Sequence, residues 1–177
     1  ILTHPERDHM TGLLEVLGRY KVENILWTGV LRDTAEFKKW QELIAEEETS
    51  IVIAESPLRI HLNKSAYIDI LHPAESLDGK AVKNTNNTSI IARLVFGKES
   101  FLFTGDIYKS TELDLIGLDI DSDVLKVSHH GSKTSSAPEF IEAVSPQIAV
   151  IQSGRDNSYG HPHKETLETL KKYDIDI

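Results

Sequence analysis

Four short clusters of acidic and histidine side chains are the first feature of this sequence with chemical potential. They span His4–His9, Gly105–Asp106, His129–Ser132 and Gly160–His163. Each cluster follows a short apolar run that is typical of a strand, and side chains at strand ends are held rigidly while they stay open to solvent. Since the chain has no Cys, a transition-metal site would consist of His nitrogens and carboxylate oxygens.

The first cluster offers four potential metal ligands within six residues, namely His4, Glu6, Asp8 and His9. In an extended segment His4, Glu6 and Asp8 lie on one side, whereas His9 requires a turn. Ligands that point in two directions suit two metal ions rather than one. A charged surface loop after a strand is the alternative for this cluster taken alone.

Asp106 follows the apolar run Phe101–Thr104 and a glycine. A carboxylate beside a buried strand is costly unless it is paired or binds a metal, and its two oxygens could bridge two cations. The alternative for this single residue is the cap of a following helix, because Asp is a favoured N-cap.

The histidine pair His129–His130 follows the run Val124–Val127. Because adjacent strand residues point to opposite faces, we expect one of the two to bind metal and the other to face a substrate. A pair of loop histidines before a glycine turn is the alternative. His161 and His163 are further candidates, with the start of a helix as their structural alternative.

Composition limits the classes of fold and function. The 177 residues and 19.9 kDa correspond to one ordinary domain, and 40% hydrophobic residues suffice for a core. The 19 Lys and Arg against 28 Asp and Glu give a net charge of −9, which excludes a basic coat for nucleic acid. A nucleic-acid role would need local basic residues or bound metal. The sequence has no apolar run of the ~20 residues that a membrane span needs and no signal-peptide pattern.

Hydrophobic patterning predicts strands and helices that alternate at both ends of the chain around a central antiparallel block. Strands are expected at 1–3, 24–28, 51–54, 59–62, 67–71, 89–96, 100–104, 124–127 and 148–152. One helix is expected to begin at a Thr11 cap and to run to Tyr20, and a second is expected to begin at a cap at Asp33 or Thr34. Further helices are expected near 111–116, at 138–144 and at 164–173. This order predicts α/β layers rather than a helical bundle.

Together, the motifs resemble those of the metallo-β-lactamase superfamily. Its first signature, H-x-H-x-D-H after a strand, is similar to the segment His4–His9, and its strand ending in T-G-D is similar to Leu102–Asp106. The closer resemblance is to hydrolase domains of the ComEC type, which belong to competence proteins for DNA internalisation. It rests also on Asn86–Ser89, Asp123–Ser135 and Tyr159–His163, and it covers essentially the whole chain.

This resemblance implies an α/β fold, the αββα metallo-β-lactamase sandwich, with residues 1–177 as a single metallo-β-lactamase-like domain. The family domain normally extends beyond both ends of this sequence, so the resemblance implies truncation at both ends. Two positions depart from the family pattern. Glu6 stands at the second His of the signature, where ComEC-type domains usually have Asp, and Asn86 and Asn87 lie where a further His is expected. Both changes favour oxygen-loving metals, or a second ion bound only with substrate.

The resemblance further implies a binuclear metal-dependent hydrolase, a phosphodiesterase or nuclease that acts on DNA in a competence context. The implied ligands of two divalent ions, Mn²⁺ or Zn²⁺, are His4, Glu6, Asp8, His9, Asp106, His129 and His161. Asp8 and His130 are the implied catalytic residues, with Asp8 orienting the attacking water and His130 protonating the leaving oxygen. His129 is assigned to the metal because Asn86 and Asn87 leave a coordination position open. The implied substrate contacts are Ser132, Lys133, Ser135 and His163.

Two other functions stay open at this point. One is hydrolysis of a small ester, thioester or phosphocholine-type substrate, which the net charge of −9 favours. The other is a degenerate domain that binds DNA or a protein without catalysis, which the departures at Glu6, Asn86 and Asn87 motivate. DNA is the expected partner in the first interpretation, with a membrane channel domain or another protein in the full-length context. The resemblance implies a bacterial domain, either cytoplasmic or attached to a membrane protein.

Overall fold

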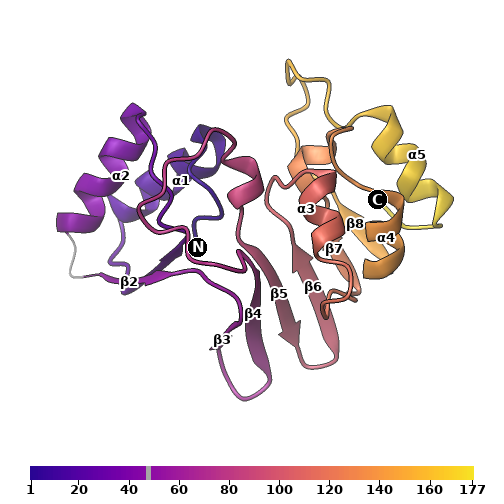
Figure 1. The fold of residues 1–177 in the computed structure, drawn as a ribbon, viewed down its shortest axis with the longest axis horizontal. Helices are drawn as coiled ribbons and strands as arrows, with labels where there is room; N and C mark the ends of the chain where they lie inside the picture. The colour runs from indigo at the N-terminus through magenta and orange to yellow at the C-terminus, as the bar shows by residue number, and fades with distance from the viewer. Residues whose placement is uncertain (47–48) are drawn as a thin grey trace.

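A computed structural model describes residues 1–46 and 49–177. The first half of the chain contains α1 (Arg7–Leu17), β1 (Asn24–Trp27), α2 (Ala35–Glu46), β2 (Ser50–Ile53), β3 (Leu58–His61) and β4 (Ala66–His72). The second half contains a 3₁₀ turn η1 (Asn86–Thr88), β5 (Ile91–Phe96), β6 (Glu99–Phe103), α3 (Lys109–Asp114), β7 (Val124–Lys126), η2 (Ser128–Gly131), α4 (Pro138–Val144), β8 (Ile148–Val150) and α5 (Lys164–Lys172). Figure 1 shows α1 and α2 gathered at one end of the molecule and α3, α4 and α5 at the other.

The strands form two sheets. One is the parallel pair β1–β2, and the other has six strands in the order β3-β4-β5-β6-β7-β8. Strands β3 to β6 pair antiparallel, whereas β6, β7 and β8 pair in parallel. Since the carboxyl ends of parallel strands meet at one edge of a sheet, the segments that follow β6, β7 and β8 are brought together there.

Three apolar clusters define the layers. One lies between α1, α2 and β1 and includes Met10, Phe37 and Trp40; the largest lies between the six-stranded sheet and α3, α4 and α5. The third joins Leu26 of β1 to Ile70 of β4 and Ala92 of β5, and therefore lies between the two sheets. The layers run helices, sheet, sheet, helices, which confirms the expected αββα sandwich.

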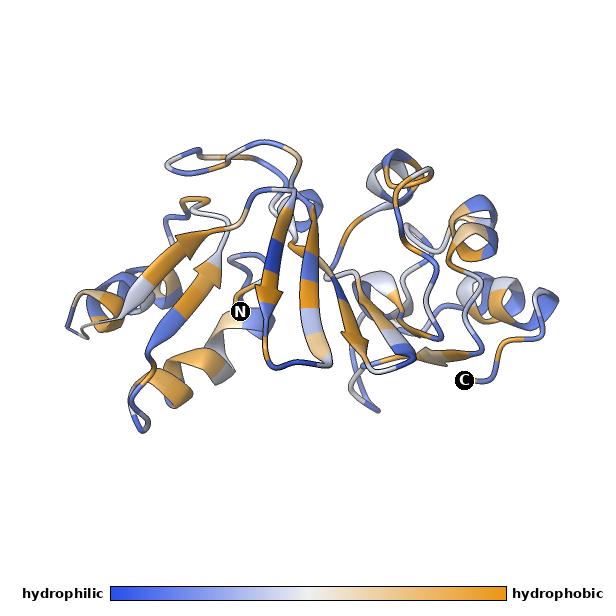
Figure 2. Ribbon diagram, turned by 90° about the horizontal axis from the view of Figure 1, so that it is seen from below, coloured by the Kyte–Doolittle hydropathy of each residue, from blue (hydrophilic) through white to orange (hydrophobic). Residues whose placement is uncertain are grey.

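Strand burial explains the two kinds of strand pattern. In β1 the three residues after Asn24 are all buried, because Ile25 and Trp27 face the helices while Leu26 faces the second sheet. A strand covered on both faces has a continuous apolar sequence. Figure 2 shows the other pattern in the strands at the centre of the molecule, where hydrophobic and hydrophilic residues alternate.

Two expectations for the N-terminal segment are wrong. The first helix begins at Arg7 rather than after a cap at Thr11, so Thr11 lies inside it and its hydroxyl donates to the Arg7 carbonyl oxygen at 2.7 Å. Residues 1–3 form no regular strand, although the Leu2 N–H donates to the Leu26 carbonyl oxygen at 2.9 Å. The cap at Thr34 is confirmed, because its hydroxyl accepts the Phe37 N–H at 3.2 Å.

The described helices are all too short or too polar to cross a membrane. The longest of them, α2, has 12 residues, against the ~20 that a span requires.

Candidate metal centre

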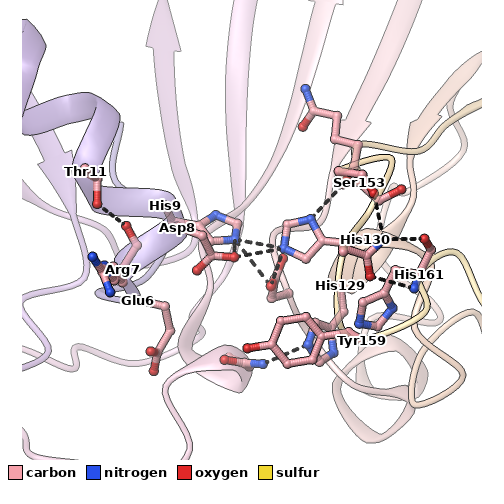
Figure 3. A pocket seen from close by; sticks show the side chains of 15 residues that line it. Glu6, Arg7, Asp8, His9, Thr11, His129, His130, Ser153, Tyr159 and His161 are labelled. Carbon is pink, nitrogen blue, oxygen red and sulfur yellow. Dashed lines mark hydrogen bonds and ion pairs between the residues drawn. The ribbon is translucent and has the colours of Figure 1, made fainter.

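Four side chains from three separate segments converge on one point. Asp8, His9, Asp106 and His130, called the quartet below, each place one potential ligand atom within 4.8 Å of the others. The His130 Nε2 atom lies 3.1 Å from Asp106 Oδ2 and 3.3 Å from Asp8 Oδ2. The His9 Nε2 atom lies 3.3 Å from both Asp106 Oδ2 and His130 Nε2. In Figure 3, Asp8 and His9 face His130 across the centre of the site.

The start of α1 positions the first two members of the quartet. Because the helix begins at Arg7, Asp8 and His9 lie in its first turn, and an acidic residue there interacts favourably with the helix dipole. Asp8 and His9 are therefore helical, whereas His4 and Glu6 of the same cluster lie in the segment that precedes the helix.

A glycine lets Asp106 reach the centre. Gly105 has φ +53°, and a Cβ placed on it would lie 2.5 Å from the Ser89 Cβ and 2.6 Å from its Oγ. The same hydroxyl accepts the Asp106 N–H at 3.0 Å. Only glycine permits this close approach, since other residues carry a Cβ and avoid positive φ.

The histidine pair lies in a left-handed turn rather than at the end of an alternating strand. His129 and His130 have φ of 48° and 55°, and Gly131 continues with 80°. Each non-glycine residue in this conformation costs about 1–2 kcal/mol. The turn is held by the His129 N–H, which donates to the Gly105 carbonyl oxygen at 3.1 Å, and so the two motifs are linked through their backbones. Backbone strain of this kind persists where the surroundings over-determine it, as at functional sites.

The structure brings His130 into the cluster of potential ligands, whereas the sequence analysis assigned His129 to the metal. His130 belongs to the quartet, and its Nδ1 is fixed by the Gln152 carbonyl oxygen at 2.8 Å. His129 instead stacks on Tyr108, with ring centroids 5.3 Å apart, and its Nε2 lies 3.4 Å from Asn86 Nδ2. The strand-alternation argument fails here because the chain turns at this point.

Two buried atoms beside the quartet have the character of metal ligands. His4 is 1% exposed, its Nδ1 contacts the hydroxyls of Thr3 and Ser89 at 3.1 Å, and its ring lies 4.2 Å from that of His9. Among the described residues, neither its Nε2 atom nor Oδ1 of Asp106 has a hydrogen-bond partner. Buried unpaired polar atoms are rare, and an imidazole nitrogen together with a carboxylate oxygen is a donor set that divalent cations take, so the residues fit such ions.

Burial and neighbouring charge set the protonation of these side chains. Burial, and secondarily His9, lowers the pKa of His4 to about 3, which keeps its Nε2 lone pair free. Burial raises the pKa of Asp106, but hydrogen bonds from His130 and His9 outweigh it and leave the carboxyl below its ordinary value. Hydrogen bonds to Asp106 and then to Asp8 raise the pKa of His130 to about 10. The carboxylates therefore attract positive charge to the centre of the site.

Glu6 lies at the edge of the site and points away from the quartet in Figure 3. Its Oε1 accepts from the Arg32 guanidinium at 2.7 Å and from the hydroxyl of Thr85. Glu6, which was expected to bind metal, therefore links the start of α1 to two segments that are distant in the sequence.

The remaining predicted ligand, His161, lies in the loop between β8 and α5 and lines the same cleft as the quartet. Its ring centroid is 5.7 Å from that of His129 and 6.3 Å from that of His130. The cleft has a volume of about 870 Å³. Its lining includes Glu6, Arg7, Asp8, His9, Thr11, Asn86, Asp106, His129, His130, Gln152, Ser153, Gly154, Asn157, Tyr159 and His161.

The predicted substrate contacts divide into buried and exposed residues. Ser132 and Ser135 are 4% and 2% exposed. The Ser135 hydroxyl bonds the carbonyl oxygens of Ser128 and Ser132, and the Ser132 hydroxyl contacts that of Thr134 at 2.9 Å. Both serines therefore stabilise the turn. Because they are buried, they are poorly placed for the contact with substrate that the resemblance implied. Lys133 is exposed, and its N–H donates to Nδ1 of the half-buried His163 at 3.2 Å.

Sequence reasoning missed Glu112 of α3, which is fully buried. Its carboxylate accepts from the Ser128 hydroxyl at 2.8 Å, the Ser136 N–H at 2.9 Å and the Ala137 N–H at 2.8 Å. Burial raises the pKa of Glu112. The only local signal was an acidic residue in a mostly polar helix, which is indistinguishable from an ordinary exposed glutamate.

Comparisons with known proteins identify the family of this chain. The family model of the metallo-β-lactamase superfamily matches residues 1–155. ComE operon protein 3 of Bacillus subtilis is 32% identical over 181 residues, which cover all of this chain and 22% of that protein. Recombination protein 2 of Haemophilus influenzae is 39% identical over 88 residues, or 50% of this chain and 11% of that protein. The chain thus spans about a fifth or less of the length of these relatives.

Solved structures support the fold. The metallo-β-lactamase fold protein YhfI from Bacillus subtilis aligns with a TM-score of 0.55 at 13% identity, over 98% of this chain and 70% of that one. The diiron β-hydroxylase CmlA from Streptomyces venezuelae aligns with a TM-score of 0.53 at 13% identity, over 97% of this chain and 40% of that one. At such identities the likeness concerns the fold alone.

Proposed function

The chain belongs to the metallo-β-lactamase superfamily, and from this premise we propose that it hydrolyses phosphodiester bonds in DNA with bound divalent ions. The superfamily typically consists of metal-dependent hydrolases. The observation that carries the proposal is the quartet, whose two carboxylates and two imidazoles converge at an open cleft. An intact quartet also argues against a degenerate domain that only binds a partner.

Bound divalent ions polarise a phosphoryl oxygen and lower the pKa of a water molecule, which supplies a nucleophile at neutral pH. The quartet would hold one ion, with His9 and His130 as nitrogen ligands and Asp106 as the buried carboxylate ligand. Asp8 is the most exposed member, with 65% of its side chain accessible, so it also suits the orientation of the attacking water.

His129 takes the proton-transfer role that the resemblance implied for His130. It lines the cleft beside the quartet without belonging to it, and its Nδ1 is oriented by the Thr134 hydroxyl at 3.2 Å. A histidine in this position can donate a proton to the leaving oxygen. His161 lies beside His129, with ring centroids 5.7 Å apart. Its buried Nδ1 has no hydrogen-bond partner among the described residues, so His161 is a second candidate to contact the leaving group.

A second ion is part of the proposal. Its ligands would be the buried, unpaired His4 Nε2 and Asp106 Oδ1 atoms, so that Asp106 serves both ions. We propose Mn²⁺ or Zn²⁺, with activity in Mn²⁺ at least equal to that in Zn²⁺, because carboxylate ligands suit the harder ion.

The choice of DNA rests on the relatives. Their names describe a competence-operon protein and a recombination protein, and a second competence protein, from Neisseria gonorrhoeae, is 38% identical over 52% of this chain. Since these relatives are several times longer than the chain, we also propose a membrane channel domain or another protein as its partner in the full-length context.

The test uses a labelled DNA oligonucleotide and the purified chain, with EDTA, Mn²⁺, Zn²⁺ or Mg²⁺. We expect no cleavage in EDTA, cleavage in Mn²⁺, and a loss of at least about a hundredfold in Asp106→Asn, which keeps the shape of the side chain. Asp114→Asn, in the exposed part of α3, is the matched control and should cleave normally. Wild-type protein that carries metal yet leaves DNA intact would contradict the proposal.

The net charge of −9 favours a second candidate, a small ester or phosphodiester substrate. The same preparation assayed on a small chromogenic phosphodiester and on a thioester distinguishes the two. A kcat/KM for a small ester far above that for DNA would favour this alternative.

A further inference from the structure

Four aromatic rings are linked by pairwise contacts beside the quartet. Tyr108 stacks on His129 at 5.3 Å between centroids with an interplanar angle of 26°. His129 lies 5.7 Å from His161, and His161 lies 5.7 Å from Tyr159 at 34°. These contacts connect Tyr108, His129, His161 and Tyr159, called the aromatic row below, and the last three of these residues line the cleft.

Tyr159 ends the row with its ring open to solvent. It is 76% exposed, the most exposed large hydrophobic side chain described, yet it lines the cleft. Figure 3 shows its ring next to His161, on the side of the cleft that holds His129. An aromatic ring that is exposed at the rim of a cleft presents a face on which a base can stack.

The loop beneath Tyr159 is fixed by one side chain. The Asn157 amide donates to the carbonyl oxygens of Gly154 and His161, both at 2.7 Å, and its Oδ1 accepts the His161 N–H at 2.9 Å. Tyr159 lies between the two anchored positions, so the ring is presented by a braced loop.

Charge determines which kind of contact could hold a nucleic acid here. A net charge of −9 opposes binding through neutralised phosphates, which is the usual source of affinity for DNA. Stacking of bases on aromatic rings does not need positive charge and contributes strongly per base. Base faces are accessible in single strands and hidden in a duplex.

We propose that Tyr159 and His161 form a stacking platform that selects single-stranded polynucleotide, with the base next to the scissile phosphate on the Tyr159 ring. The proposal rests on the proposed function and names its substrate class. It accounts for the exposure of Tyr159, the bracing by Asn157 and the shortage of positive charge.

The test measures binding of a fluorescent phosphorothioate oligo-dT strand, which resists cleavage, by anisotropy in Mn²⁺. We expect Tyr159→Ala to weaken binding about tenfold and Tyr159→Phe to bind like the wild type, because the ring and not the hydroxyl makes the contact. Tyr20→Ala is the matched control, since Tyr20 is 67% exposed and follows α1 away from the cleft. The same strand annealed to its complement should bind the wild type at least about tenfold more weakly.

An abasic strand with the same backbone separates base contacts from phosphate contacts. It should bind weakly and equally to the wild type and to Tyr159→Ala. The proposal is overturned if Tyr159→Ala binds oligo-dT within twofold of the wild type, or if duplex, abasic strand or a free mononucleotide binds as tightly as the single strand. Its failure is distinct from failure of the proposed function, which wild-type cleavage assays test separately.

Discussion

The carboxylate of Glu112 accepts a hydrogen bond from the hydroxyl of Ser128 at 2.8 Å, and both side chains are fully buried. Glu112 lies in α3, the helix that follows Asp106, and Ser128 begins the turn that contains His130. This contact therefore fixes the two motifs that place the buried carboxylate and the imidazole of the quartet 3.1 Å apart.

Replacing Glu112 should loosen this link. In Glu112→Gln the amide nitrogen would face the Ala137 N–H, so a buried donor loses its acceptor at a cost of about 1–3 kcal/mol. We expect lower stability in urea unfolding and a weaker affinity for Mn²⁺ in titration. Glu139→Gln, an exposed change in the first turn of α4, is the control. Wild-type stability in Glu112→Gln would refute the link.

The pH dependence of stability gives a second readout of Glu112. Burial raises its pKa, so the folded chain binds this proton more tightly than the unfolded chain does. The free energy of unfolding therefore falls as pH rises from the pKa of an unfolded glutamate, ~4.3, through the raised value. Urea unfolding of metal-free protein should show that Glu112→Gln lacks this slope. Identical slopes in both proteins would contradict the assignment.

Gly105 is predicted to be irreplaceable. A methyl group at this position would collide with Ser89 and would also disfavour φ +53°, so Gly105→Ala should lose about 2 kcal/mol or more and displace Asp106. Gly12→Ala is the control, because Gly12 is exposed in α1 with open space around it and should gain up to about 1 kcal/mol. Thermal unfolding of both variants tests this prediction. Equal melting temperatures for Gly105→Ala and Gly12→Ala would contradict it.

Glu6 provides a test of the ligand set. Since Arg32 and Thr85 hold its carboxylate, Glu6→Gln should keep wild-type metal content while it loses about 1 kcal/mol of stability. Asp8→Asn makes the same chemical change two residues away and should lose metal. Elemental analysis after dialysis measures both. An equal loss of bound metal from Glu6→Gln and Asp8→Asn would contradict this prediction and would indicate that Glu6 is a metal ligand.

Much of the fold could be predicted from hydrophobic patterning. The strands β4, β5 and β6 and the helices α4 and α5 were anticipated within a few residues, because burial on one face produces a clear period. Sequence patterning missed the start of α1 because the helix has no N-cap signal there. Its N-cap residue is Glu6, whose side chain makes no capping hydrogen bond.

The sequence indicated which residues form the site better than it indicated the role of each residue. Asp106 and His130 could be located because they follow the parallel neighbours β6 and β7, whose carboxyl ends lie at one edge of the sheet. Asp8 and His9 could be located only from the spacing of acidic and histidine residues in their own cluster. The roles of His129 and His130 depend on two positive φ angles, and the only sequence signal of that turn was Gly131. The engagement of Glu6 by Arg32 and Thr85 depends on contacts between distant segments, which a single sequence does not display.

The central claim is that the quartet, with His130 and not His129, holds catalytic metal. The most direct measurement is bound metal per chain together with the rate of DNA cleavage for His130→Ala and His129→Ala, prepared side by side. We predict that His130→Ala loses metal and activity together, whereas His129→Ala keeps its metal and slows by roughly 10²–10⁴-fold. Full metal content in His130→Ala, with metal lost only in His129→Ala, would contradict the account.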